Sequence, residues 1–419
     1  EIIKILKDYE LWNDTKSWRY YGDTPGNVGI INNQSTNPVK SIVEKVTNCF
    51  DSRLLLECKK ANINPKDKKN APKNIKDAVN KLFYNNKNNN FNDFLKLENE
   101  TAIFATGKTK KPNISIIDKG EGQTPLMVPQ TLMSLNKSNK NDIYFMQGTY
   151  NQGGSGALNF CENGITVILT KRAPELNENS HKSDDCWSLT ITRNNSAKDN
   201  KMREPFFTYL APNTNLQDEE GRLGVINFKA DELQLWPERM TPYKKPLKYG
   251  ALIKLMEYEL KTPSSIVTDF MYHTEIMMPD AVMPCRLHEC REVYQKNKKD
   301  KNWREQTTTL QGFNFRNSKG NIKAMENNFP IENEINFQGY RFKVKVFAFK
   351  RDFEKKGDSQ AMANRRRMDK EGLIFMLGGH HYADEKKTFF TRKALGLSRI
   401  KDDLMVLVDC TGIDGDLKN

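Results

Sequence analysis

The sequence is poor in cysteine and has no long apolar segment, and both deficits narrow the class of protein. Seven irregularly spaced cysteines among 419 residues do not form a disulfide framework, which indicates a reducing compartment. The longest apolar runs, 372–377 and 404–408, are far shorter than the roughly 18 residues of a membrane span. Residues 1–12 lack the apolar core of a signal peptide. We therefore expect a cytoplasmic protein without a membrane segment. The missing initial Met predicts a processed chain or part of a longer one.

The composition is that of a globular protein with a basic surplus. Hydrophobic residues make up 37% and charged residues 28%, which excludes a wholly disordered chain. The length predicts two or three domains at about 150 residues each. The net charge of +13 is compatible with a polyanionic partner such as DNA, although charge says nothing about the fold.

A helix is predicted at 38–60. Asn37 is a good N-cap and Pro38 suits the first helical position. Apolar residues follow at helical spacing, namely Val43, Val46, Phe50 and Leu54. The next segment, 61–93, is polar and low in complexity, so we expect a solvated, mobile insertion with at most short helices.

Strand patterns dominate the remainder of the first 260 residues, and a new α+β pattern follows them. Segments 102–107 and 113–118 flank a basic turn and predict a hairpin. Further strands are predicted at 165–170, 187–193, 224–228 and 251–258. Beyond residue 260, 264–300 looks helical in parts, 341–350, 372–377 and 403–409 look like strands, and 387–397 reads as a helix. We therefore expect an α+β protein with domains at 1–260 and 261–419.

Three polar residues on the 38–60 helix share one face. Glu44, Asn48 and Asp51 stand at i, i+4 and i+7. A carboxamide oxygen is a hard ligand suited to Mg²⁺, and a carboxylate one turn away can orient and deprotonate water. By itself the pattern is weak and is more typical of a solvated helix face.

The strand at 113–118 ends in Asp118, which is followed by Gly120 and Gly122. A carboxylate at a strand end can accept a hydrogen bond from an exocyclic amine such as that of adenine. Glycines allow the backbone to approach a flat ring without interference from a Cβ atom. A plain glycine-containing turn is the alternative.

A glycine-rich stretch precedes an apolar segment that looks like a helix start. Its small residues are Gly148, Gly153, Gly154, Ser155 and Gly156. Backbone N–H groups there could bind phosphate oxygens. The spacing matches neither the phosphate loop GxxxxGK[ST] nor the dinucleotide motif GxGxxG, and a flexible loop is the alternative.

In this order, the helix motif, the D-x-G-x-G strand and the glycine-rich stretch resemble the GHKL ATPase superfamily. The superfamily includes DNA gyrase B subunits, heat-shock chaperones, histidine kinases, MutL and the MORC proteins. The resemblance covers about residues 20–260 and extends to Tyr249-Gly250-Ala251, which is similar to the family's Gly-Thr and closing strand. It implies a two-layer α/β sandwich, the Bergerat-type ATP-binding fold, with ATP and Mg²⁺ as ligands.

The resemblance also implies residue roles. Glu44 would be the general base, Asn48 would coordinate Mg²⁺, and Asp118 would bind the adenine amine. Gly120 and Gly122 would shape the base pocket. The phosphate lid would comprise Gly148, Gly153, Gly154, Ser155 and Gly156. Asp51 matches the chaperone and MutL version of the helix motif.

Two features depart from the family pattern. Ala251 replaces a Thr, and Thr190 or Thr192 is a candidate to supply the missing hydroxyl. The insertion between Asp51 and Asp118 is unusually long, although a surface insertion costs little closure entropy.

The second half resembles a transducer domain of gyrase B, MutL and MORC proteins in its layout. Segments 372–377, 388–397 and 404–409 match a βαβ unit in outline, which argues against a histidine kinase. In such enzymes a Lys of this domain often reaches the γ-phosphate, and Lys418 is the nearest candidate. Lys137 and Lys140, just before the lid, are alternative phosphate partners, and surface lysines are the plainer interpretation of both.

Other motifs have weaker chemical meaning. His380-His381 after Gly378-Gly379 predicts a structural or nucleotide-sensing turn rather than a metal site. Zinc ligands could come from Cys285, His288 and Cys290, but no fourth ligand has the spacing of a zinc finger. The basic runs 296–301 and 365–367 could bind a DNA backbone or be solvated loops.

The function we expect is a slow Mg²⁺-dependent ATPase whose lid closure controls association into a homodimer or hetero-complex. By analogy, DNA maintenance or anti-phage (antiviral) defence is the expected setting. Two alternatives remain open: a non-catalytic polyanion- or DNA-binding module that retains the fold, and a chaperone-like ATPase that binds client proteins.

Overall fold

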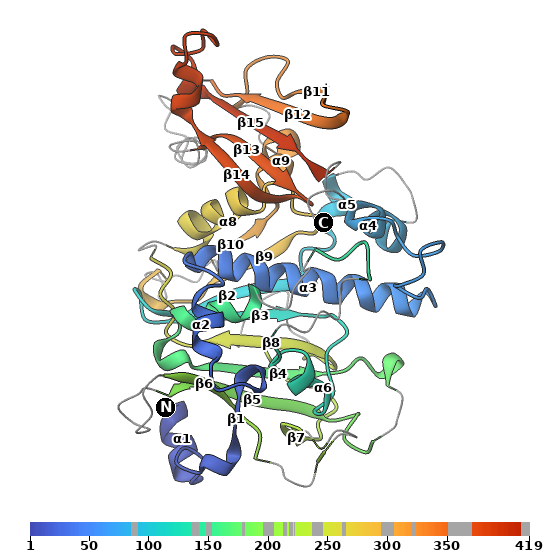
Figure 1. Cartoon of the computed structure of the whole chain (residues 1–419), viewed down its shortest axis with the longest axis vertical. Coiled ribbons are helices and arrows are strands. Elements are labelled where there is room, and N and C mark those ends of the chain that lie inside the picture. Colours follow the sequence, from blue (N-terminus) through green and yellow to red (C-terminus); the bar gives the residue numbers. More distant parts are fainter. Residues whose placement is uncertain are drawn as a thin grey trace, which may run out of the picture. The chain divides into compact units, whose positions relative to one another are not determined.

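The chain folds into two compact units, each with its own β-sheet. The computed structural model describes residues 1–84, 91–135, 142–147, 153–177, 181–195, 205–212, 216–217, 221, 223–236, 246–261, 265–294, 306–320, 324–350 and 371–411. The first unit comprises Glu1–Asn89, Lys96–Pro263 and Cys285–Thr308, and the second comprises Asn90–Leu95, Ser264–Pro284 and Thr309–Asn419. The fold is mixed α/β with two mixed sheets, consistent with the expected α+β class (Figure 1). In the described ranges no helix has both the length and the apolar character to cross a membrane.

The first unit is built on a ten-stranded sheet in the order β1-β6-β5-β4-β8-β3-β2-β9-β10, with β7 paired to β5. Its strands are β1 (Trp18–Tyr20), β2 (Thr101–Gly107), β3 (Pro112–Asp118), β4 (Thr166–Lys171), β5 (Trp187–Asn195), β6 (Phe206–Leu210), β7 (Ile226–Phe228), β8 (Gly250–Leu255), β9 (Cys285–Glu289) and β10 (Gln306–Leu310). β2 and β9 are parallel, whereas β2–β3, β3–β8 and β8–β4 are antiparallel. The hairpin and the four further strands predicted in this part of the sequence are confirmed.

The predicted helix at 38–60 is confirmed as α3 (Pro38–Lys60), and local chemistry explains where it begins. Asn37 Oδ1 accepts a hydrogen bond from the backbone N–H of Val39 (2.9 Å) and caps the first turn. Pro38 lies at the first helical position, where no N–H is needed. The predicted apolar stripe is buried: Val43, Val46, Phe50 and Leu54. α3 contacts β2 and β3 and lies on one face of the sheet (Figure 1).

Shorter helices complete the first unit. They include α1 (Ile2–Asp8), α2 (Asn27–Asn32), α4 (Ile75–Phe83), α6 (Met127–Gln130) and the 3₁₀ helix η3 (Gly153–Phe160). The insertion expected at 61–93 holds α4 and also α5 (Phe91–Leu95), so the prediction of short helices is confirmed. The insertion is not wholly solvated, because Ile75, Ala78 and Val79 of α4 are buried.

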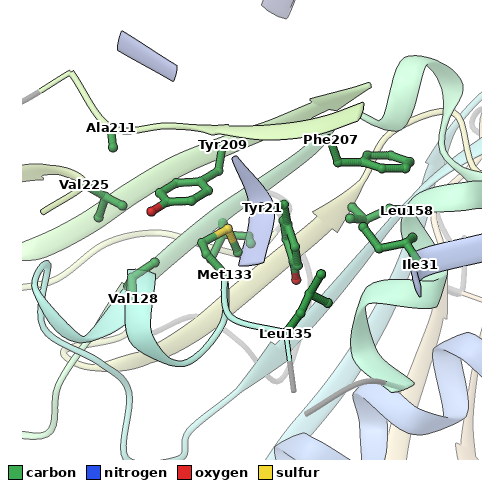
Figure 2. Packing of buried hydrophobic residues seen from close by; sticks show 11 residues of the cluster. Tyr21, Ile31, Val128, Met133, Leu135, Leu158, Phe207, Tyr209, Ala211 and Val225 are labelled. Carbon is green, nitrogen blue, oxygen red and sulfur yellow. The ribbon is translucent and has the colours of Figure 1, made fainter. Parts of the chain in front are cut away.

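Strand alternation gives the sheet two different buried faces. Asp118 and Ile116 of β3 lie on the same face as α3, since Asp118 hydrogen-bonds Cys49 of that helix. Ile117 lies on the opposite face in a cluster with Phe104 and Trp187. A further cluster joins η3 and α2 to the sheet, and Figure 2 shows Leu158 beside Ile31 and Phe207. The remaining members drawn there include Tyr21, Val128, Met133, Leu135, Tyr209, Ala211 and Val225.

The second unit contains a five-stranded sheet in the order β11-β12-β15-β13-β14. The strands are β11 (Ile331–Phe337), β12 (Tyr340–Ala348), β13 (Glu371–Leu377), β14 (His380–Lys386) and β15 (Leu404–Asp409), and the helices include α8 (Met271–Met277) and α9 (Phe313–Phe315). Predicted strands at 341–350, 372–377 and 403–409 are confirmed. The core on one face of the sheet includes Phe313, Phe347, Ile374, Met405 and Leu407.

The helix predicted at 387–397, and with it a plain βαβ unit, is wrong. β13 and β15 are parallel neighbours, but the chain between them forms β14, the short 3₁₀ helices η11 (Lys387–Thr391) and η12 (Lys401–Asp403), and turns. Phe390 is buried, whereas Leu395 is exposed and Gly396 has a φ of +64°. The apolar residues therefore do not form the continuous stripe that a packed α-helix needs.

A glycine pair forms the hairpin that leads into β14. Gly378 and Gly379 have φ values of +57° and +86°, the conformation that suits a two-residue hairpin turn. His380 and His381 were expected within a turn, but they are the first residues of β14. The His381 imidazole Nε2 lies 3.1 Å from Asp384 Oδ1, which is a local contact within the strand.

The chain enters the second unit, returns to the first, and leaves it again. Residues beyond 260 were expected to form one contiguous domain, and 264–300 was expected to be helical in parts. The structure has a π-helix, η6 (Ile266–Phe270), and α8 in that range, but β9 follows them. β9 pairs with β2 through Ile103 and Leu287, which places Cys285–Thr308 in the first unit.

Candidate functional site

The polar stripe of α3 contacts the segments that precede and form the glycine-rich turn. Asp51 is fully buried, and its Oδ1 accepts a hydrogen bond from Gln147 N (3.0 Å). Asn48 lies one turn earlier beside Gly154, where a Cβ atom would be 3.4 Å from Asn48 Nδ2. Glu44 lies a further turn toward the N-terminus and is half-buried. The three residues that were grouped by helical spacing therefore belong to one covered face.

Asp118 is a buried carboxylate at the C-terminal end of β3. Its Oδ1 accepts a hydrogen bond from Gly120 N (2.8 Å), and the Cys49 thiol also hydrogen-bonds the carboxylate. Burial raises the pKa of Asp118 to about 6, although both hydrogen bonds favour the ionised form. A carboxylate poised in this way is a strong acceptor for a buried N–H group.

Gly120 and Gly122 are required by the close packing of the turn after Asp118. A Cβ atom on Gly120 would lie 2.1 Å from Ser52 Oγ, and one on Gly122 would lie 1.8 Å from the carbonyl oxygen of Lys171. Gly122 also has a φ of +59°. Ser52 holds the same turn, because Glu121 N donates to its Oγ (3.1 Å).

Sheet register places the Thr170 hydroxyl in the same row as Asp118. Asp118 is directly opposite Ala251 of β8, and Ala251 is directly opposite Thr170 of β4, so the three residues share one face. The Thr170 hydroxyl donates to the Gly250 carbonyl (2.9 Å) and accepts from Gln123 N (3.0 Å).

Thr170, rather than Thr190 or Thr192, occupies the row of Asp118, so the expected replacement for the Ala251 hydroxyl is wrong. Thr190 donates to Leu210 O and Thr192 donates to Gly164 O, each at 2.8 Å. They lie opposite residues 168 and 166 of β4, about 7 and 13 Å along the strand from Thr170.

The glycine-rich turn begins η3 and packs on α2 and α3. Ser155 is buried, and its hydroxyl hydrogen-bonds Gln34 Oε1. A Cβ atom on Gly156 would lie 3.2 Å from Ser35 Cβ. Gly153 is the first residue of η3. Four of the predicted lid positions are therefore assembled next to the α3 stripe, namely Gly153, Gly154, Ser155 and Gly156.

Desolvated charges meet where α3 faces this turn. Glu44 Oε2 is buried with no hydrogen-bond partner, and burial raises the pKa of Glu44 against the opposing effect of Lys40 and Lys45. Burial lowers the pKa of Lys45. A Cβ atom on Gly154 would lie 4.0 Å from Lys45 Nζ.

Several sequence candidates lie outside the described residues. These are the predicted phosphate partners and lid residue Lys137, Lys140, Lys418 and Gly148, and the basic runs 296–301 and 365–367. The roles predicted for these residues remain predictions.

The zinc interpretation of Cys285, His288 and Cys290 is wrong. Cys285 and His288 are three residues apart on β9, so their side chains point to opposite faces of the sheet. The His288 ring stacks on Phe104 at 4.6 Å between centroids. Among the described residues no cluster of three or more His, Cys, Asp or Glu side chains could hold a metal ion.

No protein-family model matches the chain, and no curated protein matches its sequence significantly.

Two groups of residues make up the candidate site. We call Asp118, Gly120, Gly122, Ser52 and Thr170 the Asp118 pocket, and Glu44, Lys45, Asn48, Gly154 and Ser155 the Glu44 end. The Asp118 pocket offers a buried carboxylate acceptor, held by a tightly packed glycine turn, to a flat polar ring. The Glu44 end offers a carboxylate, a carboxamide, an ammonium group and a glycine turn to an anionic group and a hydrated cation. Sequence reasoning missed Ser52, Thr170 and Lys45, and only Lys45, adjacent to Glu44, had a local signal.

Proposed function

We propose that the chain binds ATP with Mg²⁺ and hydrolyses it slowly, as a GHKL-type ATPase with a Bergerat-type sandwich as its ATP-binding fold. The observation that carries this proposal is the position of Asp118, a buried carboxylate on the α3 face of the sheet within a glycine-lined turn. The α3 stripe supports it, since Asn48 lies beside Gly154 and Glu44 lies one helical turn from Asn48. The chain order of these elements supports it as well.

The Asp118 pocket would bind the base. The Asp118 carboxylate would accept a hydrogen bond from the exocyclic amine of adenine. Gly120 and Gly122 would shape the turn that holds Asp118, because Ser52 Oγ and the Lys171 carbonyl oxygen occupy the space that Cβ atoms would need. Thr170 would supply the hydroxyl that Ala251 lacks. A site built around a hydrogen-bond acceptor rejects bases that lack the matching donor, so adenine should be preferred over guanine.

Mg²⁺ fits the Glu44 end as a partly hydrated ion. The Asn48 carboxamide oxygen is a hard ligand, and such a site usually has few protein ligands because phosphates and waters complete the octahedron. The lack of a three-residue acidic cluster among the described residues agrees with that pattern. When bound, Mg²⁺ would neutralise charge on the phosphates.

Glu44 would perform the chemistry. Its carboxylate would orient a water molecule and take one of its protons as the oxygen attacks the γ-phosphorus. The bond to the β–γ bridging oxygen breaks, giving ADP and inorganic phosphate. A buried carboxylate with a raised pKa is a better base than a solvated one, because proton transfer is most efficient when the pKa approaches the working pH.

Partner control is part of this proposal. The turn at Gly153–Phe160 contacts α3 and hydrogen-bonds Gln34 through Ser155, and ATP would shift it only through contacts that differ between its open and closed forms. Such closure would promote formation of a homodimer or hetero-complex, in a cytoplasmic setting such as DNA maintenance or anti-phage defence.

Titration of the protein with a non-hydrolysable ATP analogue and Mg²⁺ tests the proposal by calorimetry and by the mass of the assembly. We expect saturable binding that weakens about 10- to 100-fold in Asp118→Asn, because the new amide donor would face the amine of adenine. Equal affinity in Asp118→Asn would refute the base assignment, and no binding by the unmodified protein would refute the function.

Polyanion binding without hydrolysis is the second candidate. Four lysines between α3 and α4 are exposed: Lys66, Lys68, Lys69 and Lys73. A steep fall in DNA affinity with salt, together with no ATP turnover, would favour this candidate.

A further inference from the structure

Lys45 lies in an unusual environment for a helical lysine. It is adjacent to Glu44 on α3, yet its ammonium group has no hydrogen bond or ion pair with any of the described residues. Lys40, five residues earlier on the same helix, is exposed to solvent. A lysine usually extends its ammonium group into water or toward a carboxylate, and a desolvated cation without either is costly.

Glu44 supplies the counter-charge among the groups around the ammonium. Its electrostatic neighbours are Cys161, Cys49 and Glu44. Burial raises the pKa of both thiols, so Cys49 and Cys161 stay neutral at physiological pH. Glu44 is the only carboxylate among these neighbours, and its Oε2 makes no hydrogen bond. Lys45 is therefore attracted to Glu44 but makes no hydrogen bond with the described residues, so its N–H donors are open to a ligand.

The geometry directs this cation to the glycine-rich turn. Lys45 and Asn48 are three residues apart and so lie on neighbouring positions of one helix surface. A Cβ atom on Gly154 would be 4.0 Å from Lys45 Nζ and 3.4 Å from Asn48 Nδ2. Because Gly154 has no side chain, an oxygen seated against its backbone could be reached by both groups.

We propose that Lys45 binds the terminal phosphate of the nucleotide, with its ammonium group donating to non-bridging phosphate oxygens beside Gly154. This inference rests on the proposed function. It names a phosphate-binding cation inside α3, whereas the sequence candidates Lys137, Lys140 and Lys418 lie outside the described residues. Glu44 is the counter-charge of this half-buried ammonium in the free protein, and a terminal phosphate would add hydrogen-bonded partners, so the site discriminates ligands by their terminal phosphate.

The test compares Lys45→Met with Lys40→Met as a matched control from the same helix. Affinities for a non-hydrolysable ATP analogue with Mg²⁺ and for adenosine are measured with each variant, together with the melting temperature of the free protein. Methionine keeps the length of the side chain and removes the charge. We expect Lys45→Met to lower the affinity for the ATP analogue about 10- to 100-fold and to leave the affinity for adenosine within about twofold. Lys40→Met should change both affinities less than threefold.

Stability provides an independent readout. Because Lys45 is half-buried and attracts Glu44 without a hydrogen bond, its burial cost and its attraction to Glu44 oppose each other, and the melting temperature of Lys45→Met should stay within a few degrees of that of the unmodified protein. If Lys45→Met does not fold, Lys45→Gln is tested in its place. An unchanged affinity for the ATP analogue, or an equal loss for adenosine, would overturn the role of Lys45 while leaving the ATPase proposal intact. Failure of the unmodified protein to bind either ligand would overturn both.

Discussion

The two ends of the candidate site differ in how far their polar groups satisfy one another. In the Asp118 pocket, Gly120 N donates to Asp118, Glu121 N donates to Ser52, and Thr170 both donates and accepts. At the Glu44 end, by contrast, Glu44 Oε2 is buried without a hydrogen bond among the described residues, and partial burial lowers the pKa of Lys45 beside it.

This difference indicates which end is complete before a ligand binds. Internal hydrogen bonds fix the Asp118 pocket, so a base would enter a preformed cradle and lose little free energy to reorganisation. Unsatisfied charges at the Glu44 end cost stability in the free protein and become useful only when a charged ligand pairs with them. Mutations in the Asp118 pocket should therefore affect both stability and binding, whereas mutations at the Glu44 end should affect binding or turnover without a cost in stability.

The largest effect is expected from Gly122→Ala. A Cβ atom would lie 1.8 Å from the Lys171 carbonyl oxygen in a backbone with a φ of +59°, so the turn must move. We expect loss of measurable nucleotide binding and a melting temperature lower by roughly 5 to 10 °C. Gly29→Ala is the control, because nothing lies within 4 Å of its added Cβ atom. A Gly122→Ala protein that melts and binds normally would show that the pocket is not rigid.

Glu44→Gln should have the next largest effect, and on turnover alone. The amide cannot take a proton from water, so we expect kcat to fall about 10²- to 10⁴-fold while the affinity for ATP changes less than threefold. The melting temperature should not fall, because a carboxylate with an unpaired buried oxygen has been neutralised. Single-turnover hydrolysis and calorimetry measure the two quantities, with Glu57→Gln as the control on the same helix. Loss of binding with loss of turnover would reassign Glu44 to ligand contact.

The pH dependence of stability should identify Asp118. Its pKa of about 6 in the folded protein exceeds the ordinary value of 3.8, so the native state holds this proton more tightly than the unfolded state. The resulting stabilisation is fully present below pH 3.8 and is lost as the pH rises through 6. It amounts to about 3 kcal/mol. Urea unfolding at pH 4 and pH 8 gives the free energies of unfolding of the unmodified protein and of Asp118→Asn. The difference between the two proteins should change between these pH values because only the unmodified protein has this carboxylate.

A constant difference between these two proteins across that range would mean that Asp118 is not desolvated. The affinity for adenosine should change with pH in the opposite direction to this stabilisation. Adenosine is the suitable ligand because it has no phosphate that would titrate in the same range. Because a proton on the carboxylate competes with the amine of adenine, the affinity should fall below pH 6 by about tenfold per pH unit at most.

Local chemistry made much of the first unit predictable. The cap at Asn37, the apolar stripe of α3 and the hairpin of β2 and β3 depend on neighbours in sequence, and all were predicted correctly. The helix predicted at 387–397 failed because its apolar residues pack individually: Phe390 joins Ala348 and Leu404, whereas Leu395 is exposed.

Long-range register determined what the sequence did not show. Thr170 is 52 residues beyond Asp118 in the chain, and only the pairing of β3, β8 and β4 places both on one row. The return of the chain to the first unit depends on the pairing of β9 with β2, which no local pattern encodes. Lys45 is next to Glu44 in sequence, but the burial that lowers its pKa and its approach to Gly154 depend on packing against residues far along the chain.

The smallest effect is expected from Thr170→Val, and it separates binding from stability within the Asp118 pocket. Valine keeps the shape but leaves Gln123 N without its acceptor, so the free energy of unfolding should fall by about 1 to 3 kcal/mol. Thr190→Val is the matched control, since it removes a buried hydroxyl that donates to Leu210 O at a similar distance. Both variants should lose stability.

Only Thr170→Val should also lower the affinity for adenosine, by roughly two- to fivefold, because of the two hydroxyls only that of Thr170 lies in the row of Asp118 and Ala251. Calorimetry with adenosine and urea unfolding give the two measurements on the same preparations. If Thr190→Val weakens adenosine as much as Thr170→Val does, the hydroxyl is not a base contact. The binding loss would then reflect general loosening of the sheet, and the Asp118 pocket would be less preformed than its hydrogen bonds indicate.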